Sequence, residues 1–347
     1  MNTEKYDVVI VGAGPAGCAC ALSLTETNLK IAVIDKGNPH KNKICGDALS
    51  KDVLNQIEKL PEGIGTSFYQ LPHKLRSAGI RFYAPNRECM EIPFIRGEKE
   101  DISGYVCKRS DFDRILINGL KEFSNITYFQ DTSVINIVRE NEEVHVITLN
   151  KTFRGKMLVG ADGANSLVAK KMGMVTKDKE SYFVGLRSYF ENVSGFHQEN
   201  FIELHFCKEI LPGYLWVFSM NKNMANVGVG VSSKNIFNKK IQLKSQLEKI
   251  IKQNLSLSYR FKDAKQIGKY EAWGIPVGLK KKKISGDRYV LVGDAAYLVD
   301  PFTGEGVGNA LRSGRIAATH IITCFKSQLF DEKFNKHFDD LLYTKMG

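Results

Sequence analysis

The stretch "YDVVIVGAGPAG" at residues 6–17 decides the fold of this 347-residue chain. A β-branched apolar run ends at Gly12, and the small residues that follow the glycine-rich turn are compatible with a helix. A second β-branched run, "KIAVID" at residues 30–35, completes a strand–helix–strand unit of the kind found in buried parallel sheets. Because strand, GxGxxG turn, helix and a downstream acid occur in order, the unit predicts a dinucleotide site.

Each part of this unit has a predicted role in binding. Gly12 allows the tight turn, Gly14 lets the backbone approach a pyrophosphate, and Gly17 lets the helix pack closely on the strand. The N–H groups at the helix N-terminus attract phosphate charge, and Asp35 is positioned for the ribose hydroxyls. The residues expected to bind the cofactor here are Gly12, Gly14, Pro15, Ala16, Gly17, Asp35 and Lys36.

The rest of the chain leaves this pattern and later returns to it. Residues 108–123 have helical periodicity with Ser110 or Asp111 as the N-cap, and residues 175–285 are chiefly β with one helix at roughly 240–254. Buried-strand and helix patterns resume at 289–296 and 304–325. We therefore predict an α/β fold. Its Rossmann-type domain (1–75, 100–174 and 286–330) is interleaved with a mostly antiparallel β-sheet substrate domain (76–99 and 175–285), and a short helical tail (331–347) follows.

Composition narrows the class of protein. The hydrophobic content of 43% predicts a sizeable core, and the sequence shows neither a bilayer-spanning apolar stretch nor a signal-peptide pattern, so we expect a cytoplasmic globular protein. The seven cysteines are scattered without a CxxC pair, which predicts neither a disulfide framework nor a metal site. The net charge of +11, with "KKKK" at 280–283, suggests anionic cofactors or peripheral contact with an anionic membrane; a solvated loop is the alternative for that run. No nucleic-acid-binding motif accompanies it.

Two further stretches identify the dinucleotide by resemblance. "VGADGANS" at 159–166 and "LVGDAAYLVDPFTGEGVGNAL" at 291–311 resemble signatures of the FAD-binding flavoproteins that include aromatic hydroxylases, halogenases and geranylgeranyl reductases. Asp294 can accept a hydrogen bond from a ribityl hydroxyl, with an N-cap role as the alternative, and the N–H groups of residues 304–306 can face the flavin pyrimidine edge, where reduction accumulates negative charge. Arg109 in "CKRSDFDRIL" matches an arginine that faces FAD in these proteins; a surface arginine at a helix start is the alternative. The resemblance further implies FAD contacts at Asp162, Gly163, Gly293, Asp294, Pro301, Gly304, Glu305, Gly306 and Val307.

Within this superfamily, three stretches resemble the geranylgeranyl reductase family: "KICGD" at 43–47, "PGYLWVFSMNKNMANVGVG" at 212–230 and "WGIPVG" at 273–278. That family uses FAD, reduced by NAD(P)H or another donor, to saturate carbon–carbon double bonds of prenyl chains. The resemblance implies a FAD contact at Lys43, and a catalytic centre at Cys45, Gly46 and Asp47. It also implies that the cavity for a hydrophobic or prenyl-lipid substrate is lined by Tyr214, Trp216, Phe218 and Pro276. Alternating aromatic residues are equally typical of one face of a buried strand, so core packing stays open for residues 214, 216 and 218.

Cys45 has a specific chemical use in such a reaction. An isolated alkene accepts hydride poorly, so its reduction needs a proton donor near the carbon that does not receive the hydride. The Cys45 thiol can take part in that delivery, directly or by relay from Asp47 or a water, while packing as a small hydrophobe is the alternative. Leu215, Ser219 and Asp47 differ from the residues usual in the family, which leaves the cavity shape and hence the substrate open.

Other functions are compatible with the same motifs. A FAD-dependent monooxygenase acting on an aromatic or other small hydrophobic substrate is the first alternative, and a non-catalytic FAD-binding protein is the second. A halogenase is less favoured, because the Trp-x-Trp-x-Ile-Pro element of that group is absent. The sequence shows no second GxGxxG unit for a nicotinamide, so it does not name the electron donor. It does not specify the oligomeric state either.

Overall fold

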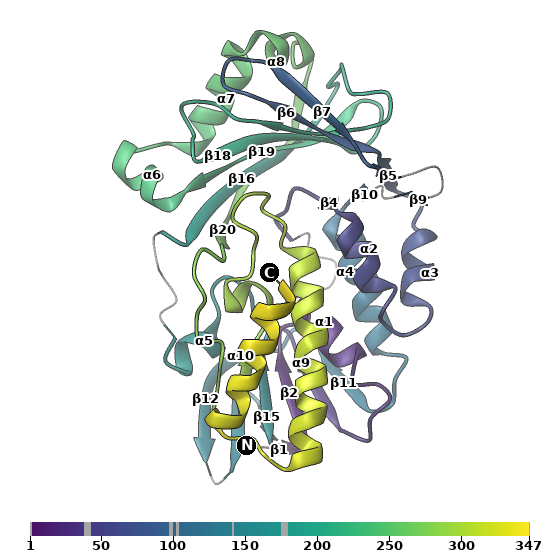
Figure 1. Cartoon of the computed structure of the whole chain (residues 1–347), viewed down its shortest axis with the longest axis vertical. Helices are drawn as coiled ribbons and strands as arrows, with labels where there is room; N and C mark the ends of the chain where they lie inside the picture. The colour runs from purple at the N-terminus through teal and green to yellow at the C-terminus, as the bar shows by residue number, and fades with distance from the viewer. Residues whose placement is uncertain are drawn as a thin grey trace.

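The structure is a computed structural model that describes residues 2–37, 43–96, 100–101, 104–140, 142–174 and 180–346. The chain forms two lobes: a parallel sheet with helices lies in the lower half of Figure 1, and a broad, mostly antiparallel sheet with a helical layer lies in the upper half. No helix among the residues described is both long and apolar enough to cross a membrane. The α/β class predicted from the sequence is confirmed.

A sheet of six described strands forms the centre of the lower lobe. Its order is β11 (Ile126–Phe129), β3 (Ile31–Ile34), β2 (Val8–Val11), β15 (Met157–Gly160), β22 (Tyr289–Leu291) and β21 (Ser285–Gly286), parallel except for the last pair. Every residue of β2 and β3 is buried, as expected for apolar strands covered on both faces. Because parallel strands end at the same edge, the residues that follow β2, β3, β15 and β22 meet there.

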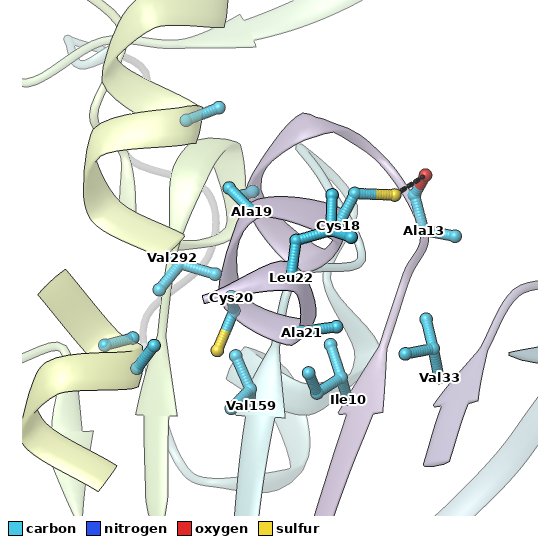
Figure 2. Close-up of a cluster of buried hydrophobic side chains, with 14 of the residues drawn as sticks. Ile10, Ala13, Cys18, Ala19, Cys20, Ala21, Leu22, Val33, Val159 and Val292 are labelled. Atoms are coloured by element: carbon cyan, nitrogen blue, oxygen red, sulfur yellow. Dashed lines mark hydrogen bonds between the residues drawn. The ribbon is translucent and has the colours of Figure 1, made fainter. Parts of the chain in front are cut away.

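Helices of the lower lobe pack through small residues. The first, α1 (Pro15–Leu22), is buried along its whole length and lies against α9 (Val307–Ser327) and α4 (Arg109–Leu120). A Cβ on Gly314 of α9 would lie 2.1 Å from the Ala16 carbonyl oxygen, so this close crossing requires glycine. In Figure 2 the side chains of Cys18 and Cys20 point to different sides of α1, and the Cys18 thiol donates to the Ala13 carbonyl (3.2 Å). The remaining helices of this lobe are α2 (Lys51–Ile57), α3 (Ile64–Tyr69), α5 (Leu167–Lys171) and α10 (Glu332–Met346).

The C-terminal segment is an integral part of this lobe. Helix α10 lies beside α9 (Figure 1) and also packs on β21. The buried Asn335 side chain donates to the carbonyls of Gly286 and Phe330 (both 2.8 Å). Satisfied buried amides of this kind tie α10 to the edge of the sheet.

Seven described strands form the sheet of the upper lobe. Their order is β20 (Lys265–Pro276), β16 (Tyr182–Glu191), β19 (Met224–Ser232), β18 (Gly213–Ser219), β17 (Ile202–His205), β6 (Gly79–Tyr83) and β7 (Cys89–Pro93), antiparallel except for β17 and β6. Valines and glycines alternate along β19, so its valines lie in the core beneath the helical layer while Gly228 and Gly230 lie on the opposite face, against Trp216. The sheet therefore has one packed face and one face free of bulky β19 side chains.

Three short helices cover the packed face: α6 (Ser233–Lys239), α7 (Leu243–Gln253) and α8 (Leu255–Arg260). The helix predicted at roughly 240–254 corresponds to α7, but the prediction of a single helix is wrong, because α6 precedes it and α8 follows it. Asn254 ends α7, and its side-chain oxygen accepts from the N–H groups of Ser256 (3.2 Å) and Leu257 (3.4 Å), which starts α8. Hydrophobic periodicity does not detect such a capped break.

Three smaller sheets complete the described fold. Their strands are β1 (Asn2–Lys5), β14 (Lys151–Gly155), β13 (Glu143–Thr148) and β12 (Val134–Glu140); β4 (Ala48–Leu49), β10 (Gly104–Cys107) and β5 (Lys74–Ser77); and β8 (Ile95–Arg96) with β9 (Glu100–Asp101). Strands β6 and β7 join strands from residues 182–276 in one sheet, so the chain crosses between lobes more than once. The domain boundaries drawn from the sequence stay a prediction.

Candidate functional site

The glycine turn at residues 12–17 combines two closely packed positions with one open position. Gly12 has φ +106°, and a Cβ there would lie 2.3 Å from the Ala161 carbonyl oxygen. A Cβ on Gly17 would lie 1.9 Å from the Gly12 carbonyl oxygen, so neither position accepts a side chain. An added Cβ on Gly14, in contrast, meets no atom within 4 Å. The backbone at Gly14 therefore borders open space that a pyrophosphate can enter.

The start of α1 leaves backbone amides for an anion. Gly14 is its N-cap, without a side-chain capping bond, and Pro15 occupies the first turn. The Asp35 carboxylate accepts from the N–H groups of Ala13 and Gly37 (both 2.6 Å), so it braces the glycine turn. Each carboxylate oxygen keeps a further lone pair for a hydroxyl donor, and the adjacent Lys36 is exposed.

A second helix start of the site lies at residues 304–307. Gly306 is the N-cap of α9 and Val307 is its first residue; Gly306 has no side chain, and the neighbouring Glu305 supplies an acceptor to the first turn. Glu305 Oε1 accepts from the Gly308 N–H (2.7 Å), and burial raises the pKa of the Glu305 carboxyl. Gly304 has φ +73°, and a Cβ there would lie 2.7 Å from the Tyr214 hydroxyl oxygen, so this loop is packed directly on β18. Pro301 of the same loop is exposed.

Asp294 and Lys43 meet beside this loop. The Lys43 ammonium nitrogen lies 3.8 Å from Asp294 Oδ2. Gly293, with φ +58°, donates its N–H to Ser313 Oγ of α9 (3.0 Å), which holds the turn against the helix. Asp294 is not an N-cap, because Val292 caps its 3₁₀ turn, so its carboxylate is available for a ligand hydroxyl.

Asp162 and Gly163, both predicted to contact FAD, have different surroundings in the structure. The Asp162 carboxylate accepts from the Ser166 hydroxyl (2.5 Å) and from the N–H groups of Leu167 (2.6 Å) and Val168 (3.1 Å), which caps α5. Gly163 has φ +79°, and an added Cβ would meet no atom within 4 Å. Of the two residues, Gly163 is the one with open space beside its backbone.

The loop that holds Cys45 lies against the aromatic residues of β18. A Cβ on Gly46 would lie 2.8 Å from Phe218 Cε2 and 3.5 Å from Trp216 Nε1. Cys45 is a half-buried free thiol whose carbonyl oxygen accepts from Asn226 Nδ2 (2.8 Å). The two motifs that carry the family resemblance, more than 160 residues apart in the chain, therefore meet.

Asp47 organises the surroundings of this loop. It is fully buried, and its Oδ2 accepts from the Tyr189 hydroxyl (2.7 Å) and from Asn226 Nδ2 (2.8 Å), while Oδ1 accepts from the Arg109 backbone N–H (3.1 Å). Burial raises the pKa of the Asp47 carboxyl, and these hydrogen bonds together with the Arg187 charge oppose the rise. A carboxylate with three donors around it is suited to holding the loop in place.

The bond to the Arg109 N–H corrects the predicted start of α4. The helix begins at Arg109 after the N-cap Lys108, whose side chain forms no capping bond, so the predicted N-cap at Ser110 or Asp111 is wrong. The acceptor comes from Asp47, 62 residues earlier in the chain. Local sequence cannot reveal a cap supplied by a distant loop.

Arg109 itself is buried, not a surface residue. It is 3% exposed, and Asp113 holds its guanidinium through Nε–Oδ1 (2.9 Å) and Nη2–Oδ2 (2.8 Å) bonds. Burial opposes its charge, but the Asp113 carboxylate and the Cys45 side chain raise the pKa of Arg109 overall. A permanent cation therefore lies beside the Cys45 thiol.

Sequence analysis missed the polar residues that support this loop from the sheet. Asn226 is fully buried and also accepts from Trp216 Nε1 (3.0 Å). Arg187 is 2% exposed, pairs with Glu271 (Nη1–Oε2, 3.0 Å) and stacks over the Tyr189 ring (4.4 Å). The available signal was a polar residue within an otherwise apolar strand, because buried polar groups in strands normally have partners.

The aromatic residues of β18 form a continuous row on the open face of the sheet. Ring centroids of Tyr214 and Trp216, and of Trp216 and Phe218, are 6.3 Å apart. Trp216 lies over the glycines of β19, where a Cβ on Gly228 would be 2.2 Å from Trp216 Cζ2. The Tyr214 hydroxyl donates to the carbonyl of Thr303 (2.6 Å). Pro276, also predicted to line the cavity, is buried at the end of β20.

These features fit FAD, because its pyrophosphate and flavin need the two kinds of surface that the fold supplies. The open backbone at Gly14 and the uncapped α1 suit the pyrophosphate, and the positive end of the α9 helix dipole suits the electron-rich edge of a reduced flavin. The fold and site define a FAD-dependent oxidoreductase. Residues 5–328 match the family described as FAD binding domain, and the chain belongs to that family.

Similarity to individual proteins indicates to which branch of the FAD-binding flavoproteins the chain belongs. Digeranylgeranylglycerophospholipid reductase 2 of Methanococcoides burtonii is 31% identical, covering 90% of this chain and 74% of that protein. The digeranylgeranylglycerophospholipid reductase of Thermoplasma acidophilum is 28% identical, covering 98% and 83%. A solved geranylgeranyl bacteriochlorophyll reductase-like protein from Thermoplasma acidophilum superposes with a TM-score of 0.85 at 26% identity, covering 99% of this chain and 84% of that one. The chain is thus a member of the geranylgeranyl reductase branch of these flavoproteins.

One similar protein belongs to another branch. The 1H-pyrrole-2-carbonyl-[peptidyl-carrier protein] chlorinase of Pseudomonas fluorescens is 26% identical, covering 99% of this chain and 81% of that protein.

Proposed function

We propose that this protein reduces carbon–carbon double bonds in the prenyl chain of a lipid, with FAD as the hydride carrier and NAD(P)H or another reductant as the electron donor. One observation carries the proposal: the Cys45 loop packs on the aromatic row of β18, and that row is bonded to the loop before α9. A thiol, an apolar surface and a flavin cradle thus adjoin one another. The names of the reductase relatives point to the same substrate class.

The surface beside Cys45 suits an alkenyl chain. Trp216, Phe218, Leu204 and Val106 form its buried part, and Ile80, Phe82, Ile202 and Phe206 are packed against them. Beyond these, Met90 and Phe302 are 56% and 66% exposed at the margin of the site. These apolar side chains and the wide apolar margin match an isoprenoid, whose burial is favoured by about 25 cal/mol per Å² of apolar area.

Bound FAD, once reduced, supplies the hydride to one carbon of the double bond. The other carbon needs a proton, and the Cys45 thiol is the donor that we assign to it; the thiol is half-buried, so water can return the proton. Gly46 keeps the loop in contact with Phe218, because a side chain at residue 46 would displace it. Asp47 acts as a positioning residue, since its carboxylate is occupied by Tyr189, Asn226 and the Arg109 N–H.

The test is product analysis with the FAD-loaded protein, reductant and a panel of prenyl diphosphates, prenylated quinones and prenyl glycerolipids. Cys45→Ala should retain FAD and lose about 10²–10⁴-fold of the reduction rate, the usual cost of a lost acid–base group. Cys89→Ala, which removes an exposed thiol on β7, is the matched control and should leave the rate unchanged. Reduction by Cys45→Ala within about twofold of the unmodified protein would contradict the assignment of the proton donor.

A second candidate is oxygen-dependent chemistry, hydroxylation or halogenation, which the similarity to the chlorinase favours. The two candidates make opposite demands on oxygen. Saturated product under anaerobic conditions supports the reductase, whereas product that requires oxygen supports the alternative.

A further inference from the structure

The helical layer on the outer face of the seven-stranded sheet, residues 233–262 (α6, α7 and α8), concentrates the charge of the protein. It contains seven lysines and one arginine against a single glutamate, a net charge of +7 out of +11 for the whole chain. Such a concentration within about a tenth of the sequence sets up a strongly positive surface.

The charges of this layer point outward. On α7, Leu247 and Ile250 are buried against the sheet, whereas Lys249 and Lys252 are exposed. Arg260 is the exception, because it is buried and its Nη1 bonds Glu203 Oε2 (2.5 Å). All seven lysines of the layer are exposed: Lys234, Lys239, Lys240, Lys244, Lys249, Lys252 and Lys262.

Few acids neutralise these lysines. Lys234 pairs with Glu180 (3.2 Å), and Lys244 lies over the Tyr270 ring (5.5 Å). Within the described part of the chain, the other five lysines form no ion pair. Their charge is therefore available to an anionic partner.

Large apolar side chains stand exposed among the lysines. Phe237 on α6 is 71% exposed, and on α8 Leu255 and Tyr259 are 71% and 79% exposed. Cations interleaved with aliphatic and aromatic side chains are typical of surfaces that lie in the headgroup region of a bilayer.

The layer and the aromatic row of β18 lie on opposite faces of the same sheet, and the contacts of the layer extend to the strands at the sheet edge. The Arg260–Glu203 bond joins α8 to β17, and Arg81 on β6 lies 3.9 Å from the same glutamate. Figure 1 draws α7, α8, β6 and β7 together at the upper end of the molecule. The exposed Met90 and Ile92 on β7 follow at the sheet edge.

We propose that this helical layer docks the protein on the surface of an anionic bilayer, with the lysines facing lipid phosphates and Phe237, Leu255 and Tyr259 inserted at headgroup depth. The proposal rests on the proposed function, because a lipid substrate dissolved in a bilayer must be reached there. In this proposal the membrane-contact surface is the helical layer and not the lysine run at 280–283. In that run Lys280 pairs with Glu180 (3.8 Å) and Lys283 with Glu332 (2.5 Å). The other two lie over the rings of Tyr343 and Tyr297 at 5.6 and 3.9 Å.

The experiment is sedimentation of the FAD-loaded protein with vesicles of phosphatidylcholine, with and without phosphatidylglycerol, at low and high salt. We expect binding only with phosphatidylglycerol and weaker binding at high salt. Replacing Lys239, Lys249 and Lys252 by Gln should weaken partitioning roughly hundredfold, because each lysine near an anionic leaflet contributes roughly fivefold. Leu255→Ser combined with Tyr259→Ser should weaken it roughly tenfold through lost apolar contact.

Two matched controls locate the surface. Replacing Lys280, Lys281 and Lys283 by Gln removes the same charge and should have little effect, and so should Leu149→Ser, which changes a residue 73% exposed on the β13–β14 turn. Equal losses in the test and control variants, or no binding to anionic vesicles, would overturn the proposal. Salt-sensitive retention on an immobilised acidic protein without vesicle binding would overturn it in favour of a protein partner. Because sedimentation does not involve turnover, its outcome is independent of the test of reduction.

Discussion

Asn226→Ala should separate the catalytic loop from the sheet. The Asn226 amide donates to the Cys45 carbonyl (2.8 Å) and to Asp47 Oδ2 (2.8 Å), and it accepts from Trp216 Nε1 (3.0 Å). Alanine removes all three bonds, and the part-buried Cys45 carbonyl and the buried Trp216 indole N–H lose this partner. With about 1 kcal/mol for each lost bond and further cost for unsatisfied groups, we expect the free energy of unfolding to fall by about 3 kcal/mol.

The functional effect should be specific to double-bond reduction. None of the three Asn226 bonds reaches the glycine turn or the start of α9, so the variant should retain FAD. The Cys45 thiol loses its anchored position, and small displacements of reacting groups cost about 10²-fold in rate. Urea unfolding monitored by tryptophan fluorescence measures the free energy of unfolding. The flavin content of the purified variant measures FAD retention, and product formation measures the rate of double-bond reduction.

Two further variants test whether the effect is specific to the hydrogen bonds of Asn226. Asn223→Ala, at an exposed position of the adjoining turn, should change the free energy of unfolding by less than about 0.5 kcal/mol. Trp216→Phe removes the indole donor, and combined with Asn226→Ala it should show a coupling of about 1 kcal/mol. An Asn226→Ala protein with the stability and reduction rate of the unmodified chain would refute the reasoning.

The remaining predictions concern glycines and the buried acid of the site. Gly46→Ala should destabilise by about 1–3 kcal/mol and slow reduction, because its Cβ would lie 2.8 Å from Phe218 Cε2; Gly65→Ala, where a Cβ meets no atom within 4 Å, is the control and should not destabilise. Gly14→Val should fold normally, since its Cβ enters open space, yet purify without yellow flavin. A Gly14→Val protein that purifies with its full content of FAD would disprove the assignment of the glycine turn as the pyrophosphate site. Burial raises the pKa of Asp47 in the folded state, so the stability of the unmodified protein relative to Asp47→Asn should fall as pH rises above the ordinary carboxyl pKa of 3.8. Denaturant unfolding at several pH values measures this difference, and a pH-independent difference would contradict it.

The amino-acid sequence by itself determined the nucleotide-binding half of the protein. Apolar β-branched runs, a GxGxxG turn and small helix residues act over short distances, and each has a steric reason visible in the chain: Gly12 and Gly17 have no room for a Cβ. Alternation of the aromatic residues at 214, 216 and 218 likewise predicted that they share one face of a strand. The resemblance of the Cys45 and β18 motifs to one family indicated that they belong to one site.

Tertiary structure alone decided how that site is held together. Asn226 bonds the Cys45 carbonyl across 181 residues of chain, and Asp47 caps a helix 62 residues away. The same holds for the helical layer, whose lysines become one surface only when α7 buries Leu247 and Ile250 on the sheet. Sequence periodicity specifies which face of an element is buried, but the partner of that face depends on packing between distant segments, and such packing leaves no local pattern in the sequence.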